Sequence, residues 1–182
     1  MVTYISMLRG INVGGQKRIK MEELIILYES LGFKNVMSYL QSGNVIFNAA
    51  ENIKGLPNVI EGKIKQVFSF PVAVLLRLPT ELQQIINNNP FLEEKGLDTD
   101  KLFITFLSDA PTESALSQIK EMPDELDRFV ANRKEIYLYC PNGYGRTKFS
   151  NDFFERKLGV TATTRNWKTV NTLFEIAKNQ SG

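Results

Sequence analysis

The sequence predicts an α+β fold made of two successive β-α-β-β-α-β units. Short runs rich in β-branched and aromatic residues alternate with segments whose apolar residues recur at helical spacing. The same order of elements is read in both halves of the chain. The 182 residues, 43% of them hydrophobic, suffice for one domain, or two small ones, with a proper core.

The first half begins with an apolar strand that ends in a glycine-rich loop and leads into a helix. Met21, Leu24 and Tyr28 share one face of that helix, which Gly32 ends. Gly43 supplies turn chemistry for the hairpin that follows. The expected elements are strand 2–8, helix 21–31, hairpin strands 36–40 and 45–47 with a turn at 41–44, a helix from residue 57, strand 72–76 and a helix from residue 79.

The second half repeats this order of elements, and it also repeats the position of one arginine. Arg77 and Arg165 both stand where the last strand of a half enters the next helix, and we expect Asn166 to cap that helix. A loop at 90–100 separates the two expected halves, residues 1–90 and 91–182. The expected elements are strand 101–107, a helix capped within 109–112 and ending at 119, strands 128–131 and 135–140, helix 150–158, strand 160–164 and a helix ending at 177.

The order β-α-β-β-α-β is that of the ferredoxin-like fold, here with an extra helix after each copy. Several strands are apolar on both faces: Ile136 and Leu138 lie on one face, and Tyr137 and Tyr139 lie on the other. Because such strands must be covered on both sides, we expect the tandem ferredoxin-like repeats to pack into one compact body. An open RNA-binding sheet is disfavoured for the same reason.

The composition excludes several classes of chemistry. The chain has no histidine, which removes His-based triads and His metal sites. Its single cysteine, Cys140, follows an apolar run and cannot form an internal disulfide. We find neither the basic start of a signal peptide nor an apolar run as long as a membrane span. We therefore expect a cytoplasmic protein with no metal, no cofactor and no membrane partner.

Charge is unevenly distributed although the formal net charge is only +2. Residues 1–21 carry four Lys or Arg and no acid, residues 22–127 carry eight bases and sixteen acids, and residues 128–182 carry ten bases and four acids. The two basic ends form one positive surface if the fold brings them together. The alternative is ordinary solvated charge.

The first candidate site is the glycine-rich loop between the first strand and the first helix. Glycine lets backbone N–H groups turn towards a ligand, and helix N-termini favour anions. The glycine spacing matches neither the dinucleotide fingerprint nor the Walker A motif, and a tight structural turn is the alternative. The residues expected to contact an anion are Arg9, Gly10, Asn12, Gly14, Gly15 and Lys17.

A second glycine-containing loop, residues 141–148, precedes a helix that begins near Ser150. Its arginine can bind phosphate with two hydrogen bonds and its lysine adds a point charge. A flexible hairpin exit with solvated cations is the alternative. Arg165 is a further candidate that can equally pair with a carboxylate. The residues expected to contribute are Gly143, Gly145, Arg146, Lys148 and Arg165.

Two other clusters have a structural explanation beside the functional one. Gln41 and Asn44, in the first hairpin, can read a base edge or an ester, but polar side chains there also satisfy turn backbone, and that interpretation is favoured. Trp167 recurs with apolar residues at helical spacing and is expected in the core. The glycine-rich and hairpin blocks contain no Asp or Glu, so they do not indicate a carboxylate-held Mg²⁺.

Five blocks of the sequence together resemble the bacterial family called domain of unknown function 1697. They occur in the expected order along nearly the whole chain. The resemblance implies a tandem ferredoxin-like fold, but it implies no activity and no catalytic residue. The blocks are residues 8–15 (LRGINVGG), 39–47 (YLQSGNVIF), 89–91 (NPF), 142–148 (NGYGRTK) and 164–169 (TRNWKT).

These observations predict a binding protein for a phosphorylated ligand, either a nucleotide-like small molecule or a nucleic-acid backbone. The chain lacks the aromatic RNA-binding pattern of RNP1, which ranks the small molecule slightly higher. Two alternatives stay open: a histidine-free enzyme acting on a phosphorylated or nucleotide substrate, and a scaffold whose loops contact a protein partner.

Overall fold

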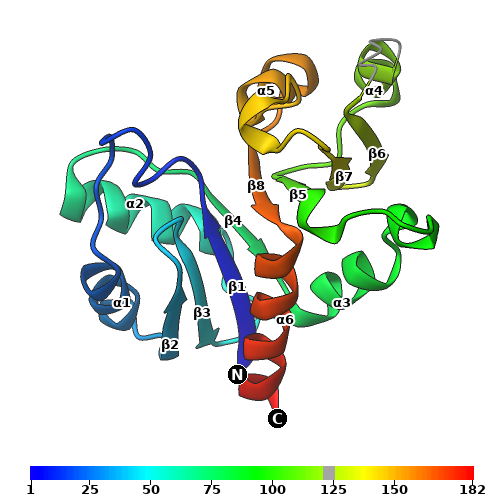
Figure 1. Cartoon of the computed structure of the whole chain (residues 1–182). Coiled ribbons are helices and arrows are strands. Elements are labelled where there is room, and N and C mark those ends of the chain that lie inside the picture. Colours follow the sequence, from blue (N-terminus) through cyan, green and yellow to red (C-terminus); the bar gives the residue numbers. More distant parts are fainter. Residues whose placement is uncertain (121–125) are drawn as a thin grey trace. The chain divides into compact units, whose positions relative to one another are not determined.

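The computed structural model describes residues 1–120 and 126–182, which divide into two compact units (Figure 1). Unit 1 comprises Met1–Gln83 and Thr172–Gly182, and unit 2 comprises Gln84–Asn171. The described residues form two four-stranded antiparallel sheets and six α-helices. The predicted α+β class is therefore confirmed.

Unit 1 contains a sheet with the strand order β2-β3-β1-β4, in which every neighbouring pair is antiparallel. Helices α1 and α2 cover the same face of this sheet (Figure 1). The elements are β1 (Val2–Leu8), α1 (Met21–Ser30), β2 (Lys34–Tyr39), β3 (Asn44–Ala49), α2 (Leu56–Phe68), β4 (Val74–Arg77) and the start of α3 (Pro79–Asn87).

The core of unit 1 lies between that sheet face and the two helices. Leu24 of α1 and Ile60 of α2 pack with the sheet residue Phe47, and all three are fully buried. Tyr28 of α1 is also buried, and its hydroxyl lies 2.7 Å from Ser6 Oγ of β1. This hydrogen bond fixes α1 on the sheet and satisfies a phenol that is removed from water.

Unit 2 contains a second sheet, with the strand order β6-β7-β5-β8, again antiparallel throughout. Three short 3-10 helices accompany it among the described residues. The elements are η1 (Pro90–Glu93), η2 (Thr99–Lys101), β5 (Leu102–Leu107), α4 (Glu113–Lys120), β6 (Arg128–Asn132), β7 (Glu135–Tyr139), η3 (Tyr144–Arg146), α5 (Asn151–Leu158), β8 (Ala162–Asn166) and the start of α6 (Trp167–Ser181).

The core of unit 2 is rich in aromatic rings. Phe149, Phe153 and Phe154 pack against one another and against residues of α4 and the sheet. Cys140 is a buried, reduced member of this core, as its apolar surroundings in the sequence predict. Trp167, which was expected in the core, is only half-buried at the start of α6.

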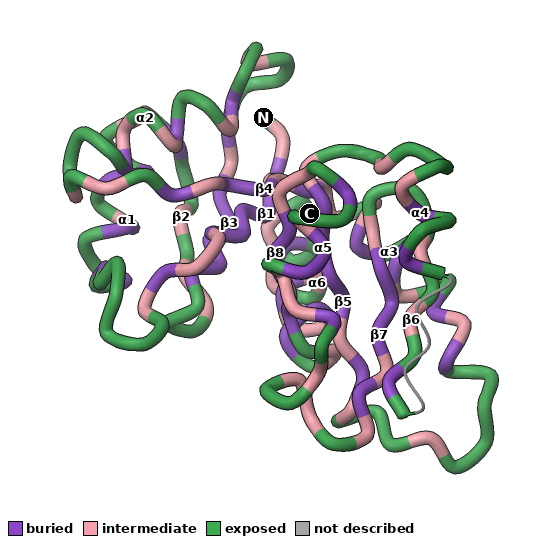
Figure 2. The backbone as a smooth tube through the Cα atoms, turned by 90° about the horizontal axis from the view of Figure 1, so that it is seen from above, coloured by how far each residue is buried: buried purple, intermediate pink, exposed green. Residues whose placement is uncertain are grey.

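The central strands of both sheets consist mostly of buried residues (Figure 2). In β1, Ser6 and Leu8 face α1 and α2, while Ile5 and Met7 point to the opposite face, and all four are buried. The predicted two-sided burial is therefore present. Among the described residues, no helix combines the length and the apolar character that a membrane span requires.

Several predicted boundaries are wrong, and those of the strands are wrong because strand pairing, and not local composition, decides them. Asn44 is the first residue of β3 and pairs with Met7 and Tyr39; the turn before it includes Leu40 and Gly43, both with positive φ. Strands β4 and β8 end later than predicted, so Arg77 and Arg165 lie within strands opposite Ile5 and Ile104. Helix α6 continues to Ser181.

Candidate functional site

The glycine-rich loop of unit 1 folds into a small hairpin. Val13 and Gln16 form an antiparallel bridge, and the Gln16 amide donates to the Val13 carbonyl at 3.0 Å. Gly14 and Gly15 lie between them with φ of +58° and +75°. Positive φ at both central residues is what a type I′ turn requires. A tight structural turn, the alternative to anion binding, therefore accounts for Gly14 and Gly15.

Asn12 ties this loop to the β2–β3 turn. Its Nδ2 donates to the carbonyls of Ile19 at 2.9 Å and Gln41 at 2.8 Å, and its Oδ1 accepts from the Ile19 amide at 2.8 Å. The Asn12 amide also donates to the Lys17 carbonyl at 3.2 Å. Asn12 thus holds the two candidate blocks of unit 1, the glycine-rich loop and the first hairpin turn, side by side.

A cavity of about 580 Å³ opens between these segments and the start of α1. Its volume falls in the range of small-molecule pockets. The glycine-rich loop, the first turn of α1 and the β2–β3 turn all contribute to its wall. The described lining residues are Asn12, Gly15, Arg18, Ile19, Lys20, Glu23 and Gln41.

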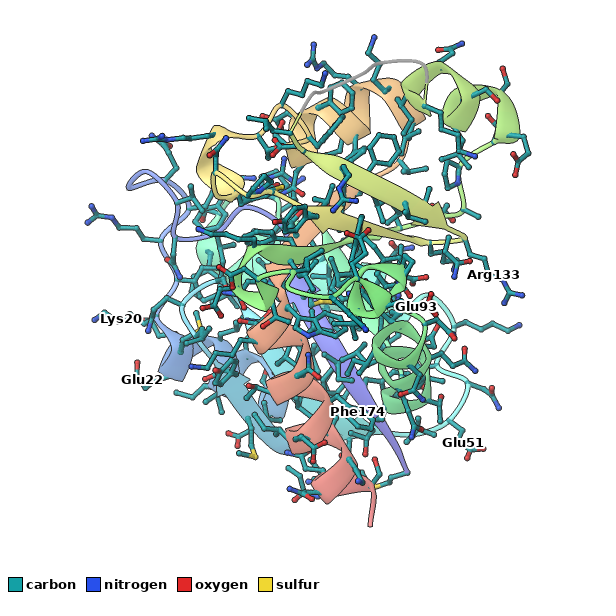
Figure 3. The ribbon with its side chains drawn as sticks, turned by 45° about the vertical axis from the view of Figure 1, so that its right-hand side comes forward. Lys20, Glu22, Glu51, Glu93, Arg133 and Phe174 are labelled. Atoms are coloured by element: carbon teal, nitrogen blue, oxygen red, sulfur yellow. The ribbon has the colours of Figure 1, made fainter. Side chains whose placement is uncertain are left out.

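Cations outnumber acids in this wall. The described lining holds two basic residues, Arg18 and Lys20, and one acidic residue, Glu23. Within residues 1–120 and 126–182, the side chains of Arg18 and Lys20 make no ion pair or hydrogen bond, and Lys20 points away from the ribbon (Figure 3). Lys20 is also the N-cap of α1, and no side chain caps this helix end. The described lining therefore combines two cationic residues with the uncapped start of α1, and both features favour an anion.

The other unit 1 candidates lie outside the described lining of the cavity. Lys17 Nζ donates to the Pro71 carbonyl at 2.8 Å. The Arg9 amide donates to the Ala73 carbonyl at 2.9 Å. Asn44 is fully buried, and its Nδ2 donates to the Tyr39 carbonyl at 2.8 Å. The structure thus brings together three predicted residues and leaves out five: Asn12, Gly15 and Gln41 line the cavity, whereas Arg9, Gly10, Gly14, Lys17 and Asn44 do not.

Arg18 and Lys20 are the lining cations that sequence reasoning did not single out. A usable signal was present, because an apolar residue between two cations in an extended segment points inward and its neighbours point outward. Ile19 is 2% exposed, and the side chains on either side of it are exposed. Reading this alternation would have selected Arg18 and Lys20 over Lys17.

In unit 2, the second loop is held to the sheet by a cluster of hydroxyl groups. The Tyr144 hydroxyl donates to Thr164 Oγ1 at 3.2 Å, and Thr164 Oγ1 donates to Asn151 Oδ1 at 2.7 Å. Thr105 Oγ1 lies 2.7 Å from the same Thr164 oxygen. Sequence reasoning missed this cluster, because its members are far apart in the chain.

The second loop enters α5 through a conventional cap. Ser150 accepts a hydrogen bond from the Phe153 amide at 3.2 Å, so this helix start, unlike that of α1, is satisfied by a side chain. Gly145 and Arg146 are exposed, Gly143 has φ of +87°, and the Lys148 ammonium lies 5.3 Å from the centre of the Phe149 ring. Contact of these four residues with a ligand stays a prediction.

Arg165 lies in β8 and is only 7% exposed. Its Nη1 donates to Thr163 Oγ1 at 2.8 Å and to the Thr164 carbonyl at 2.9 Å. Arg77 of β4 is buried in the same way, and its Nη1 donates to the carbonyl of Leu76, the residue before it, at 2.9 Å. Both guanidinium groups are therefore engaged by backbone of their own strand.

A metal centre is not indicated in the described part of the chain, where no three His, Cys, Asp or Glu side chains gather at binding distance. The family model for the "Protein of unknown function (DUF1697)" matches residues 1–137. The chain belongs to this family. This confirms the resemblance seen in the sequence, although two of the five blocks, 142–148 and 164–169, lie beyond the matched residues.

The DUF1697 chain is also similar to a solved structure, that of the conserved bacterial protein SP0830 from Streptococcus pneumoniae. The TM-score is 0.74 at 22% sequence identity, and the match covers 97% of this chain and 98% of that chain. At this identity the likeness shows a common fold. No curated protein matches the chain.

Proposed function

We propose that this DUF1697 protein binds a phosphorylated small molecule in the cavity of unit 1. The observation that carries the proposal is that one cavity is lined by the uncapped start of α1 and by two cations that have no ion pair within the described residues. Arg18 and Lys20 supply charge, and the first turn of α1 supplies backbone amides. Gln41 adds an amide side chain from the β2–β3 turn, which suits a polar group beyond the phosphate.

Asn12 has a positioning role in this proposal. Its side chain is already hydrogen-bonded to the backbone of Ile19 and Gln41. It therefore sets the distance between the cations and the β2–β3 turn, so that the site exists before the ligand arrives. A preformed site loses less conformational entropy on binding.

The test is a thermal-shift and calorimetric panel of inorganic phosphate, nucleotides and sugar phosphates. A ligand at about 100 times its Kd stabilises the folded state by about 2.7 kcal/mol. We expect Arg18→Ala and Lys20→Ala each to weaken binding by at least about tenfold, because each removes a charge-assisted contact of about 1.5–3 kcal/mol. The matched control is Arg133→Ala, which removes an exposed arginine of unit 2.

Binding that falls equally in all three variants, or a panel without any response, would contradict the proposal. Salt separates a pocket from a nucleic-acid surface, because phosphate-backbone binding weakens with a log–log slope of about −0.9 for each duplex phosphate neutralised. We expect a shallow slope. Arg146→Ala shows whether the second loop contributes to the same ligand.

We also propose that the chain is a tandem of ferredoxin-like units, with the boundary near residue 90. Support comes from the matching sheet orders, β2-β3-β1-β4 and β6-β7-β5-β8, and from the corresponding buried residues Arg77 and Arg165. An experimental structure tests the repeat: residues 2–77 and 102–166 should superpose strand for strand. A mismatch in the connection between any two paired strands would overturn it.

A further inference from the structure

Strand β6 is an edge of the unit 2 sheet, and no other described strand pairs with its outer side. It pairs with β7 on one side through five consecutive residue pairs, Arg128 to Asn132, without a register shift. Among the described residues, its backbone makes no other backbone hydrogen bond. Val130, at the centre of the strand, is 41% exposed. The strand therefore presents a row of donors and acceptors that a further strand could pair with.

The corresponding edge of unit 1 is protected against such pairing. Strand β2 has a register shift between Lys34 and Met37, and it begins with an exposed lysine. Bulges and lysines are the usual means by which proteins keep edge strands from pairing. Strand β6 has no bulge, no lysine and no proline, so it lacks the features that protect the edge strand β2 from pairing.

A cavity of about 600 Å³ follows the β6 edge and reaches around both faces of the strand. On one face Phe129 packs against Phe149, with ring centres 4.9 Å apart. On the other face the Arg128 guanidinium lies 5.3 Å from the centre of the Phe91 ring. Phe91 belongs to the Asn-Pro-Phe block that the proposed function does not use. The described lining residues are Pro90, Phe91, Glu94, Lys120, Asp127, Arg128, Phe129, Val130, Ala131 and Phe149.

The charges of the described residues that line this cavity balance one another. Arg128 and Glu94 form a two-point ion pair, with nitrogen–oxygen distances of 2.8 and 2.9 Å. The Arg128 guanidinium holds the pKa of the Glu94 carboxyl below its usual range. The two remaining lining charges, Lys120 and Asp127, are also opposite in sign. The described lining charges of two such surfaces would therefore add no net repulsion.

We propose that β6 pairs antiparallel with β6 of a second copy of this chain, about a two-fold axis through Val130. This register uses all five edge residues and places Val130 against its own counterpart. Arg128, whose charge Glu94 already balances, then faces Asn132, so no like charges stand directly opposite. The result is one continuous sheet with four strands from each copy and an isologous interface.

Analytical ultracentrifugation of the full chain tests this over a wide range of concentration. We expect a concentration-dependent rise from the mass of one chain to twice that mass. Val130→Lys places two lysines face to face at the axis and should weaken dimerisation by at least about tenfold. Met37→Lys is the matched control, because it adds the same charge to the exposed edge strand β2, where Met37 is 47% exposed. It should leave the dimer unchanged.

Amide hydrogen exchange of the unsubstituted protein gives a second readout that needs no variant. Exchange in residues 128–132 should slow as concentration rises, while exchange in β2 should not change. A chain that stays monomeric at every concentration overturns the proposal, as does a dimer that survives Val130→Lys. Loss of the dimer in Met37→Lys, or concentration-dependent protection in β2, would place the interface elsewhere and overturn it equally.

Discussion

Gly43 shows how closely the β2–β3 turn approaches the glycine-rich loop. Its carbonyl accepts from the Leu8 amide at 2.8 Å, and its φ is +84°. A Cβ at this position would lie 2.9 Å from Leu8 Cβ and 2.7 Å from Ile11 Cδ1. Glycine is therefore required at this position for two reasons: the backbone has a positive φ, and there is no room for a Cβ.

Gly43→Ala should lower the free energy of unfolding by about 2–4 kcal/mol, which combines left-handed strain with overpacking against a rigid Cβ. Urea denaturation followed by circular dichroism measures it. Gly32→Ala is the control, because φ there is +86° but no atom lies within 4 Å of an added Cβ. It should cost only the conformational part, about 1–2 kcal/mol. Equal costs for the two variants would refute the packing argument.

The N-terminus of helix α5 in unit 2 has a side-chain cap, whereas that of helix α1 in unit 1 has none. Helix α5 is capped by Ser150, and its first residue, Asn151, accepts a hydrogen bond from Thr164. Helix α1 begins after Lys20 without a side-chain cap and carries Glu22 and Glu23 in its first turn. The α1 start thus keeps amides available beside the unit 1 cavity, at the expense of some helix stability.

Ser150→Ala should destabilise the protein by about 1 kcal/mol, because the Phe153 amide loses its acceptor. The midpoint of urea unfolding reports the change. Ser117→Ala is the matched control: Ser117 is exposed within α4 and its hydroxyl bonds the Glu113 carbonyl. Since alanine favours a helix interior, this variant should be neutral or slightly stabilising. A larger loss at Ser117 than at Ser150 would be inconsistent with the capping role.

At the scale of the whole molecule, both units bury a tyrosine hydroxyl. Tyr137 in unit 2 donates to the Ile85 carbonyl at 3.0 Å, and burial raises its pKa to about 12. Burial also raises the pKa of Tyr28 in unit 1. An unfolded tyrosine titrates near pH 10. In the alkaline range above pH 10, the unfolded chain has therefore lost protons that the folded chain still holds.

Stability should be unaffected by these tyrosines below about pH 10 and should fall as the pH rises from about 10 to 12, since the unfolded state then binds fewer protons. Urea midpoints measured from neutral to alkaline pH check this, with tyrosinate absorbance as a second readout. Tyr137→Phe should be less stable at neutral pH, because the Ile85 carbonyl loses its donor, but should show a shallower alkaline decline. An unchanged slope would argue against Tyr137 as a contributor.

The sequence predicted an element well when the residues that define it are close together in the chain, and less well when they are far apart. The helical spacing of apolar residues and the glycine that ends the helix were enough to place α1, because its apolar face and Gly32 lie in one short segment. The ends of β4 and β8 were missed because the hydrogen-bonded neighbour β1 or β5 decides which residues belong to each strand. The same holds for Asn44, which local turn chemistry places in a turn and pairing places in a strand.

By itself, the sequence determined the α+β class, the family and the position of the glycine-rich loop between the first strand and the first helix. These depend on patterns within short segments. Tertiary structure decided which polar groups remain available. Local sequence indicates that Arg18 and Lys20 point outward, but it could not reveal that the Asn12 side chain is hydrogen-bonded to Ile19 and Gln41, or that a cavity lies beside the two cations. A side chain's hydrogen-bond partners lie wherever folding brings them, and only after those partners are counted can a charge be assigned to a ligand.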